Sequence, residues 1–105
     1  MRFNVKVQEK IARIIGDYFT TNEITSIFSN ANIKTNETLY AKWRITLDAF
    51  NKLSTEEGFF NIIEQFCHPL NFIEPQYRQK FVEKLNEILA YEFLDIVTTE
   101  RTAKV

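Results

Sequence analysis

The chain has 105 residues, a length that fits one domain built around one hydrophobic core. With 13 basic and 14 acidic side chains its formal net charge is −1, so bulk charge predicts neither a nucleic-acid partner nor a membrane partner. Only two glycines and two prolines are present, which argues against an all-β sandwich and in favour of helices.

Two helices are predicted near the N-terminus. Apolar side chains at three- and four-residue steps predict a helix over residues 5–19, in which Gly16 marks either close packing or fraying. Thr20 and Glu23 have the spacing of a capping box, so we expect a second helix to start there. Its expected buried face consists of Ile24, Ile27, Phe28 and Ala31.

The middle of the chain predicts two more helices. Ile33 is the single apolar residue of a polar loop, and we expect it to pack into the core. A helix over residues 37–53 has apolar side chains on two sides, which predicts that it is the central helix of the fold. Ser54 and Glu57 then form a second capping box, followed by a fourth helix that reaches Phe66.

Two prolines delimit the last helix. Pro69 ends the fourth helix, because a residue before proline is disfavoured in the α region, and Pro75 suits the first position of a fifth. β-branched residues without a helical period follow, so we expect residues 94–97 to be extended. The predicted fold is an all-α, compact bundle of about five helices with a short extended C-terminal tail. We expect a single helical domain over residues 1–97 and a flexible tail or linker over residues 98–105.

Cys67 and His68 are the only cysteine and the only histidine, and their adjacency raises the question of a reactive site. Neighbouring residues of a helix point about 100° apart, so the two side chains cannot act on each other as nucleophile and base. A zinc site needs at least three protein ligands, and no further cysteine or histidine can supply them. We expect Cys67 to pack as a small hydrophobe and His68 to cap or hydrogen-bond the C-terminus of its helix. The sequence therefore predicts no catalytic residue, no metal and no cofactor, and a protein that is not an enzyme.

The cysteine content also indicates a compartment. One cysteine excludes an intrachain disulfide, so we expect a reducing, cytoplasmic setting. The first ten residues contain no long apolar run, so we expect no signal peptide, and no segment has the length of a membrane span.

Four basic residues share one side of the first predicted helix: Arg2, Lys6, Lys10 and Arg13. Such a row either contacts phosphates or an acidic partner, or is a solvated helix face flanked by Glu9 and Asp17. Charge is also unevenly divided along the chain. Residues 1–52 carry eight basic and five acidic groups, a net +3, and residues 53–105 carry five and nine, a net −4.

Trp43 lies between two cations, Lys42 and Arg44, in the third predicted helix. We expect Trp43 to anchor the core while the two cations extend into solvent. The alternative is a Trp-centred binding hot spot, with Lys42 and Arg44 at the interface.

The order of the segments carries a family resemblance. "FTTNEITSIFSNANI" precedes "AKWRITLDAFNKL", and a helix ending in "HPLNF" precedes "YRQKFVEKLNEILAYEFLDI". This order resembles a helical N-terminal domain of bacterial and archaeal abortive-infection proteins, which commonly precedes an effector such as a HEPN-type ribonuclease. The resemblance covers residues 8–97. Its matching residues are Phe19, Thr20, Glu23 and Ile24, then Lys42 and Trp43, then Pro69 and Phe72, and finally Leu85, Asn86 and Leu89.

The sequence departs from that family at two places. His68 precedes the proline where the family often has asparagine, and "EFLDI" follows the last helix where the family often has glycine. The catalytic Arg and His motif of the effector is absent. The resemblance therefore implies a sensing or adaptor module in phage defence, either part of a longer chain or a stand-alone relative.

Two functions remain open at this point. The first is a non-catalytic adaptor that binds a protein partner or effector domain, or that self-associates as a homodimer. The second is a small nucleic-acid-binding helical domain that uses the basic stripe of the first helix.

Overall fold

The computed structural model describes residues 3–92 and 94–105. Within them the chain forms five α-helices, three 3-10 turns and a two-stranded antiparallel sheet, which confirms the predicted all-α bundle with a short extended tail. The helices are α1 (Val5–Tyr18), α2 (Thr21–Asn30), α3 (Lys42–Asn51), α4 (Glu56–Phe66) and α5 (Pro75–Leu89). The shorter elements are η1 (Glu37–Leu39), η2 (Pro69–Asn71), η3 (Ala90–Glu92), β1 (Val97–Thr98) and β2 (Ala103–Lys104).

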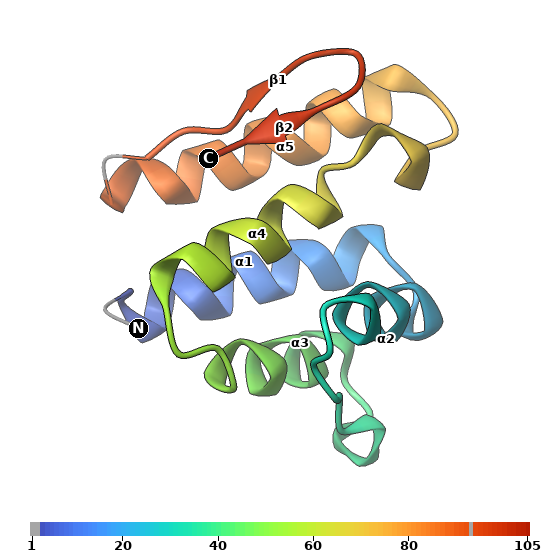
Figure 1. Ribbon diagram of the computed structural model, residues 1–105, viewed down its shortest axis with the longest axis vertical. Helices are drawn as coiled ribbons and strands as arrows, with labels where there is room; N and C mark the ends of the chain where they lie inside the picture. The colour runs from blue at the N-terminus through green and yellow to red at the C-terminus, as the bar shows by residue number, and fades with distance from the viewer. Residues whose placement is uncertain (1–2, 93) are drawn as a thin grey trace.

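The central helix of the bundle is α1. It packs against both α3 and α5, and the ribbon of Figure 1 shows it between α3 and the α5 side of the molecule. The prediction that the third helix is central was therefore wrong. Gly16 explains the close approach of α1 and α3, because a Cβ at this position would lie 3.4 Å from both Lys42 Cβ and Trp43 N.

Phenylalanine rings build the core as one continuous chain of contacts. Phe28 touches Phe50 and Phe66 with ring centroids 5.8 and 5.6 Å apart, in edge-to-face geometry. Phe19 extends the chain from Phe66 to Phe81 at 5.2 and 5.3 Å. All nine phenylalanines of the described residues take part in such ring pairs, so the high phenylalanine content is used mainly inside the fold. They are Phe3, Phe19, Phe28, Phe50, Phe59, Phe60, Phe66, Phe72 and Phe81.

The first predicted capping box is confirmed and the second is displaced. Thr20 Oγ1 accepts the Glu23 N–H at 3.2 Å, and Glu23 Oε1 accepts the Thr20 N–H at 2.8 Å. At the start of α4 the cap is Thr55, whose hydroxyl accepts the Gly58 N–H at 3.0 Å. The predicted Ser54–Glu57 box was wrong because this hydroxyl, one residue later, sets the first turn.

The third helix begins five residues later than predicted, because the preceding segment adopts a different local structure. Asn36 Oδ1 accepts the Thr38 N–H at 3.2 Å and so caps the short turn η1. Tyr40 then has φ 61°, outside the helical region, and α3 starts only at Lys42. Ala31, which we expected to be buried on α2, is exposed because it is the C-cap beyond the last helical turn.

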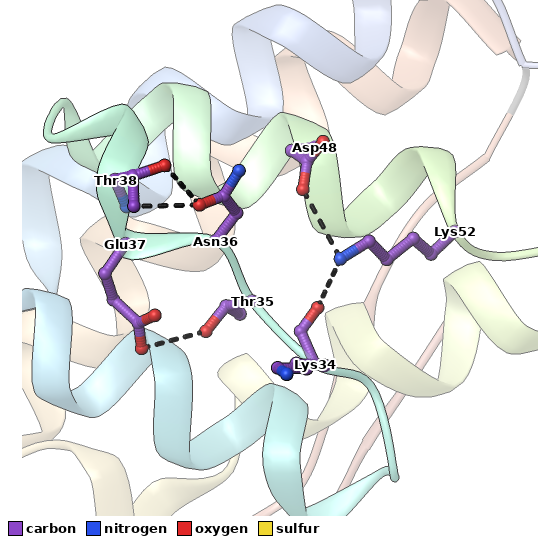
Figure 2. Close-up of polar contacts among 7 residues, drawn as sticks. All are labelled: Lys34, Thr35, Asn36, Glu37, Thr38, Asp48 and Lys52. Carbon is purple, nitrogen blue, oxygen red and sulfur yellow. Dashed lines mark hydrogen bonds and ion pairs between the residues drawn. The ribbon is translucent and has the colours of Figure 1, made fainter.

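The loop before α3 is tied to that helix by one lysine. Lys52 Nζ donates to the Lys34 carbonyl at 2.7 Å and lies 3.5 Å from Asp48 Oδ2, as Figure 2 shows. This connection holds residues 33–35 near α3, and the predicted packing of Ile33 against the core is found.

The C-terminal segment differs most from its prediction. Residues 98–105, expected as a flexible tail or linker, contain most of a hairpin in which Thr98 pairs with Ala103. Ala103 is buried, and β2 packs against α4. Figure 1 shows the hairpin lying along α5, with the C-terminus near the middle of the molecule. A short, largely polar segment carries no sequence signal for such docking, because its partners lie far away along the chain.

Candidate functional site

The Cys67–His68 corner has structural roles. Cys67 is fully buried, and its burial raises the pKa of the thiol from 9.0 to about 12. At that pKa the reactive thiolate is essentially absent at neutral pH, so Cys67 packs as a small hydrophobe, as predicted.

His68 caps a turn, although not the end of α4 that we predicted. Its Nδ1 accepts the Leu70 N–H at 3.1 Å, which makes His68 the N-cap of η2. The reason is Pro69, which forces His68 into an extended conformation and turns its side chain toward the following segment.

The predicted basic stripe is partly assembled on α1. Lys6, Lys10 and Arg13 are all exposed, whereas Arg2 lies outside the described residues. Arg13 is already engaged, because its Nε lies 3.4 Å from Glu9 Oε2. Over the described part of the chain, the ammonium groups of Lys6 and Lys10 have no hydrogen-bond or ion-pair partner. Among the residues that the structure describes, this face therefore offers Lys6 and Lys10 as free cations.

Trp43 is half-buried beneath two guanidinium groups. Arg13 Cζ lies 3.9 Å from the centroid of its ring and Arg44 Cζ lies 5.2 Å away. Trp43 packs against the core, as predicted. Lys42 does not simply extend into solvent, because its Nζ donates to the Phe19 carbonyl at 3.2 Å and so satisfies the end of α1.

The structure brings together a different constellation around Arg78 on α5. Its Nε donates to the Cys67 carbonyl at 2.8 Å, and its Nη1 and Nη2 donate to the carbonyls of Thr99 and Thr102 at 2.6 and 2.7 Å. One side chain thus connects the end of α4, the start of α5 and the hairpin turn. Sequence reasoning missed Arg78, because all three acceptors are backbone atoms 11, 21 and 24 residues away.

Two further side chains fix the hairpin. Asn86 Oδ1 accepts the Ile96 N–H at 2.8 Å, and Asn86 Nδ2 donates to the Ile96 carbonyl at 3.4 Å, so the amide replaces a neighbouring strand. On the other side, Glu64 Oε2 accepts the Val105 N–H at 3.0 Å and Glu64 Oε1 lies 3.5 Å from Lys104 Nζ.

A groove of about 870 Å³ runs between α5 and β1. Phe72 and Ile73 contribute apolar surface to it, and the buried Val82 and Ile96 also line it. Its acidic side chains are Glu74, Glu83 and Glu100, and its one cation is Arg78. The volume lies in the range of ligand-binding sites, and the apolar surface with a few charged groups is the composition that such sites have.

Exposed apolar side chains gather beside this groove, in the segment between η2 and the first turn of α5. Leu70 is 88 % exposed, Ile73 is 97 % exposed and Tyr77 is 51 % exposed. We call these three residues the corner patch. The sequence contained a signal for it, because apolar residues between Pro69 and Pro75 have no helical stripe that would bury them.

A second hollow, of about 590 Å³, lies between α2 and the loop that follows it. Its wall is polar, and the loop side chains in it bond to one another. Thr35 Oγ1 donates to Glu37 Oε1 at 3.3 Å, and the Asn36–Thr38 pair lies beside them, as Figure 2 shows. These hydrogen bonds stabilise the loop itself, so they do not point to a ligand in this hollow.

Metal and membrane sites can be assessed for the same part of the molecule. In residues 3–92 and 94–105, no three His, Cys, Asp or Glu side chains gather where they could hold a metal ion. No helix within these ranges is both long and apolar enough to span a bilayer.

Comparison with protein-family models, with curated proteins and with solved structures finds no match to this chain. Residues that carry the resemblance to abortive-infection domains have structural roles: Thr20 and Glu23 cap α2, and Asn86 holds Ile96. Phe72 belongs to the aromatic chain of the core. The resemblance therefore rests largely on residues that shape the fold, two of which, Phe72 and Asn86, also line the groove between α5 and β1.

Proposed function

We propose that this chain is a non-catalytic protein-interaction module whose docking surface is the corner patch together with the adjoining groove. The observation that carries the proposal is the exposure of Leu70, Ile73 and Tyr77 in one short segment. Large apolar side chains that are exposed within a few residues of one another are typical of surfaces that a partner covers. Tyrosine, represented here by Tyr77, is one of the residue types that contribute most of the affinity in protein interfaces.

The resemblance to the abortive-infection domain supports a biological setting for this module. We propose that it is an adaptor or sensor in a cytoplasmic phage-defence system and that it recruits or restrains an effector. The partner is that effector or, through self-association, a second copy of the chain. The buried, protonated Cys67 supports the non-catalytic part of the proposal, since it removes the strongest nucleophile of the sequence from solvent.

The test uses the double variant Leu70→Glu/Ile73→Glu and, as control, Tyr40→Glu, which changes a side chain that is 87 % exposed at a distant turn. We expect the wild type to form a dimer in sedimentation or to co-purify with a partner from cells under phage attack. The double variant should lose that association and the protection measured by plaque counts, and the control should keep both. A strictly monomeric wild type from which no partner is recovered would contradict the proposal.

A second function has one observation in its favour. Lys6 and Lys10 are exposed on one face of α1 and unpaired within the described chain, so they are free to contact phosphates. Two such contacts predict a slope of log affinity against log salt of roughly −2 for duplex DNA. Lys6→Glu/Lys10→Glu should abolish binding measured by fluorescence anisotropy. Binding that is absent, or that does not depend on salt, would remove this alternative.

A further inference from the structure

The two outer edges of the hairpin differ in what covers them. The β2 edge is covered by α4, where Glu64 accepts the Val105 N–H and lies close to Lys104. Among the described residues β1 pairs with β2 alone. On its other edge Asn86 bonds to Ile96, but no strand lies beside Thr98. An open strand edge carries unpaired N–H and C=O groups and is a template for another strand.

The register shows which backbone groups are free. Thr99 N–H donates to the Thr102 carbonyl at 2.9 Å, and Thr98 is opposite Ala103. Hydrogen-bonded and non-hydrogen-bonded pairs alternate in an antiparallel ladder, so the Thr98–Ala103 pair is a non-hydrogen-bonded one. The N–H and C=O of Thr98 therefore point away from β2, and Thr98 lies along the groove.

Charge restricts what the groove accepts. Glu74, Glu83 and Glu100 contribute three negative charges and Arg78 one positive charge, a net −2. The N–H groups of Arg78 that face the hairpin and α4 already donate to carbonyls, so this cation has little left to offer an acidic ligand. Glu100 has no hydrogen-bond or ion-pair partner among the described residues. An acidic groove beside a free strand edge is complementary to a basic segment in extended conformation.

We propose that the groove binds an extended, positively charged segment of a partner protein, which pairs with Thr98 as a third strand of the hairpin sheet. This inference rests on the proposed function and specifies the partner's chemistry. The segment alternates apolar side chains, which pack on Phe72 and Ile73, with Lys or Arg side chains, which reach Glu83 and Glu100. The backbone pairing supplies affinity and the alternation supplies register.

The probe is the peptide acetyl-KVKVKVK-amide, titrated into the isotope-labelled 105-residue chain and followed by amide NMR shifts at low salt. We expect shifts concentrated at Ile96, Thr98 and Val82. A copy of the peptide that is N-methylated at alternate backbone nitrogens should bind about tenfold more weakly, because it lacks the strand-pairing N–H groups. The acidic counterpart acetyl-EVEVEVE-amide should not bind.

Variants of the protein test the same two features. Thr98→Pro removes the outward N–H, which the hairpin does not use, and should weaken binding about tenfold, whereas Thr98→Val should not. Glu83→Lys/Glu100→Lys should weaken binding about fivefold or more at low salt. Glu87→Lys, which reverses one charge on an exposed α5 residue outside the groove, should leave it unchanged. The methylated peptide serves as the backbone test if Thr98→Pro disturbs the hairpin.

The outcomes separate this inference from the proposed function. Equal binding of the acidic or the methylated peptide, or shifts confined to other surfaces, overturns the inference. If the basic peptide fails to bind while Leu70→Glu/Ile73→Glu still abolishes partner association, the inference is wrong and the proposed function stands. If the peptide binds as expected but that double variant changes neither association nor phage protection, the proposed function is wrong.

Discussion

Arg78 makes the sharpest prediction, because a single side chain connects three segments. Arg78→Met keeps the length and apolar stem of the side chain and removes its three hydrogen bonds. The bond to the partly buried Cys67 carbonyl contributes about 1.5 kcal/mol, and those to Thr99 and Thr102, which water can replace, about 0.5 kcal/mol each. The total, about 2.5 kcal/mol, should appear as easier opening of the hairpin.

Amide hydrogen exchange measures that opening directly. The Thr99 N–H is protected by its bond to Thr102, and the Val105 N–H by Glu64. We expect both to exchange about 60-fold faster in Arg78→Met, since 1.4 kcal/mol corresponds to a factor of ten. The Ile63 N–H in α4 should change much less, because the core stays folded.

Two further variants control this experiment. Lys80→Met removes a cation from an exposed position of the same helix and should leave hairpin exchange unchanged. Arg78→Lys should lie in between, because an ammonium group cannot reproduce the planar fork that reaches three carbonyls. If Arg78→Met leaves the Thr99 and Val105 exchange within twofold of wild type, the hairpin is held by other contacts and the reasoning fails.

Three other predictions concern single positions, each checked by urea unfolding. Gly16→Ala should change the free energy of unfolding by no more than about 1 kcal/mol, because the better helix propensity of alanine offsets the tight contact of its Cβ. Gly16→Leu should destabilise the protein by about 2 kcal/mol or more, because the larger side chain forces α1 away from α3. Equal effects of the two variants would contradict the close packing. Tyr40→Gly should stabilise the protein by about 1 kcal/mol, because glycine adopts a φ of 61° without strain and the exposed tyrosine side chain contributes little buried surface. Tyr40→Ala should give no such gain, because alanine keeps the strain. The pKa of Cys67 is raised from 9.0 to about 12, so the folded chain keeps a proton in that window that the unfolded chain releases. Wild-type stability should therefore be intact below pH 9 and fall as pH rises above it, by about 1.4 kcal/mol per pH unit more steeply than in Cys67→Ala; parallel pH profiles would contradict the burial of the thiol.

The exposed apolar residues of this protein are informative because the phenylalanines of the described chain are not among them. So many phenylalanines could have formed an exposed apolar surface on a small domain, but all nine rings of the described residues contact one another in ring pairs. The exposure of the corner patch, Leu70, Ile73 and Tyr77, is therefore not the result of a core too small to hold its phenylalanines. It extends from η2 to the first turn of α5, two elements that each begin at a proline.

The sequence by itself determined the local elements. Thr20 and Glu23 start α2 because both bonds of a capping box lie within four residues, and Pro75 begins α5 because its missing N–H needs no partner there. Helical periodicity likewise placed most of the buried side chains, since the 3.6-residue repeat is a property of the chain alone. The failures were also local: a hydroxyl at Thr55 and the positive φ of Tyr40 moved two helix starts.

Only the tertiary structure decided how these elements meet. It made α1 the central helix, placed Arg13 over Trp43, and converted a predicted flexible tail into a hairpin held by Arg78. The candidate site follows the same division. The exposure of Leu70 and Ile73 could have been predicted from their position between Pro69 and Pro75, whereas the groove could not. The walls of the groove come from segments some 20 residues apart, which are joined where Arg78 donates to backbone carbonyls. Every residue type has a backbone carbonyl, so the acceptors cannot be recognised in the sequence. The sequence therefore held no pattern from which that meeting could be read.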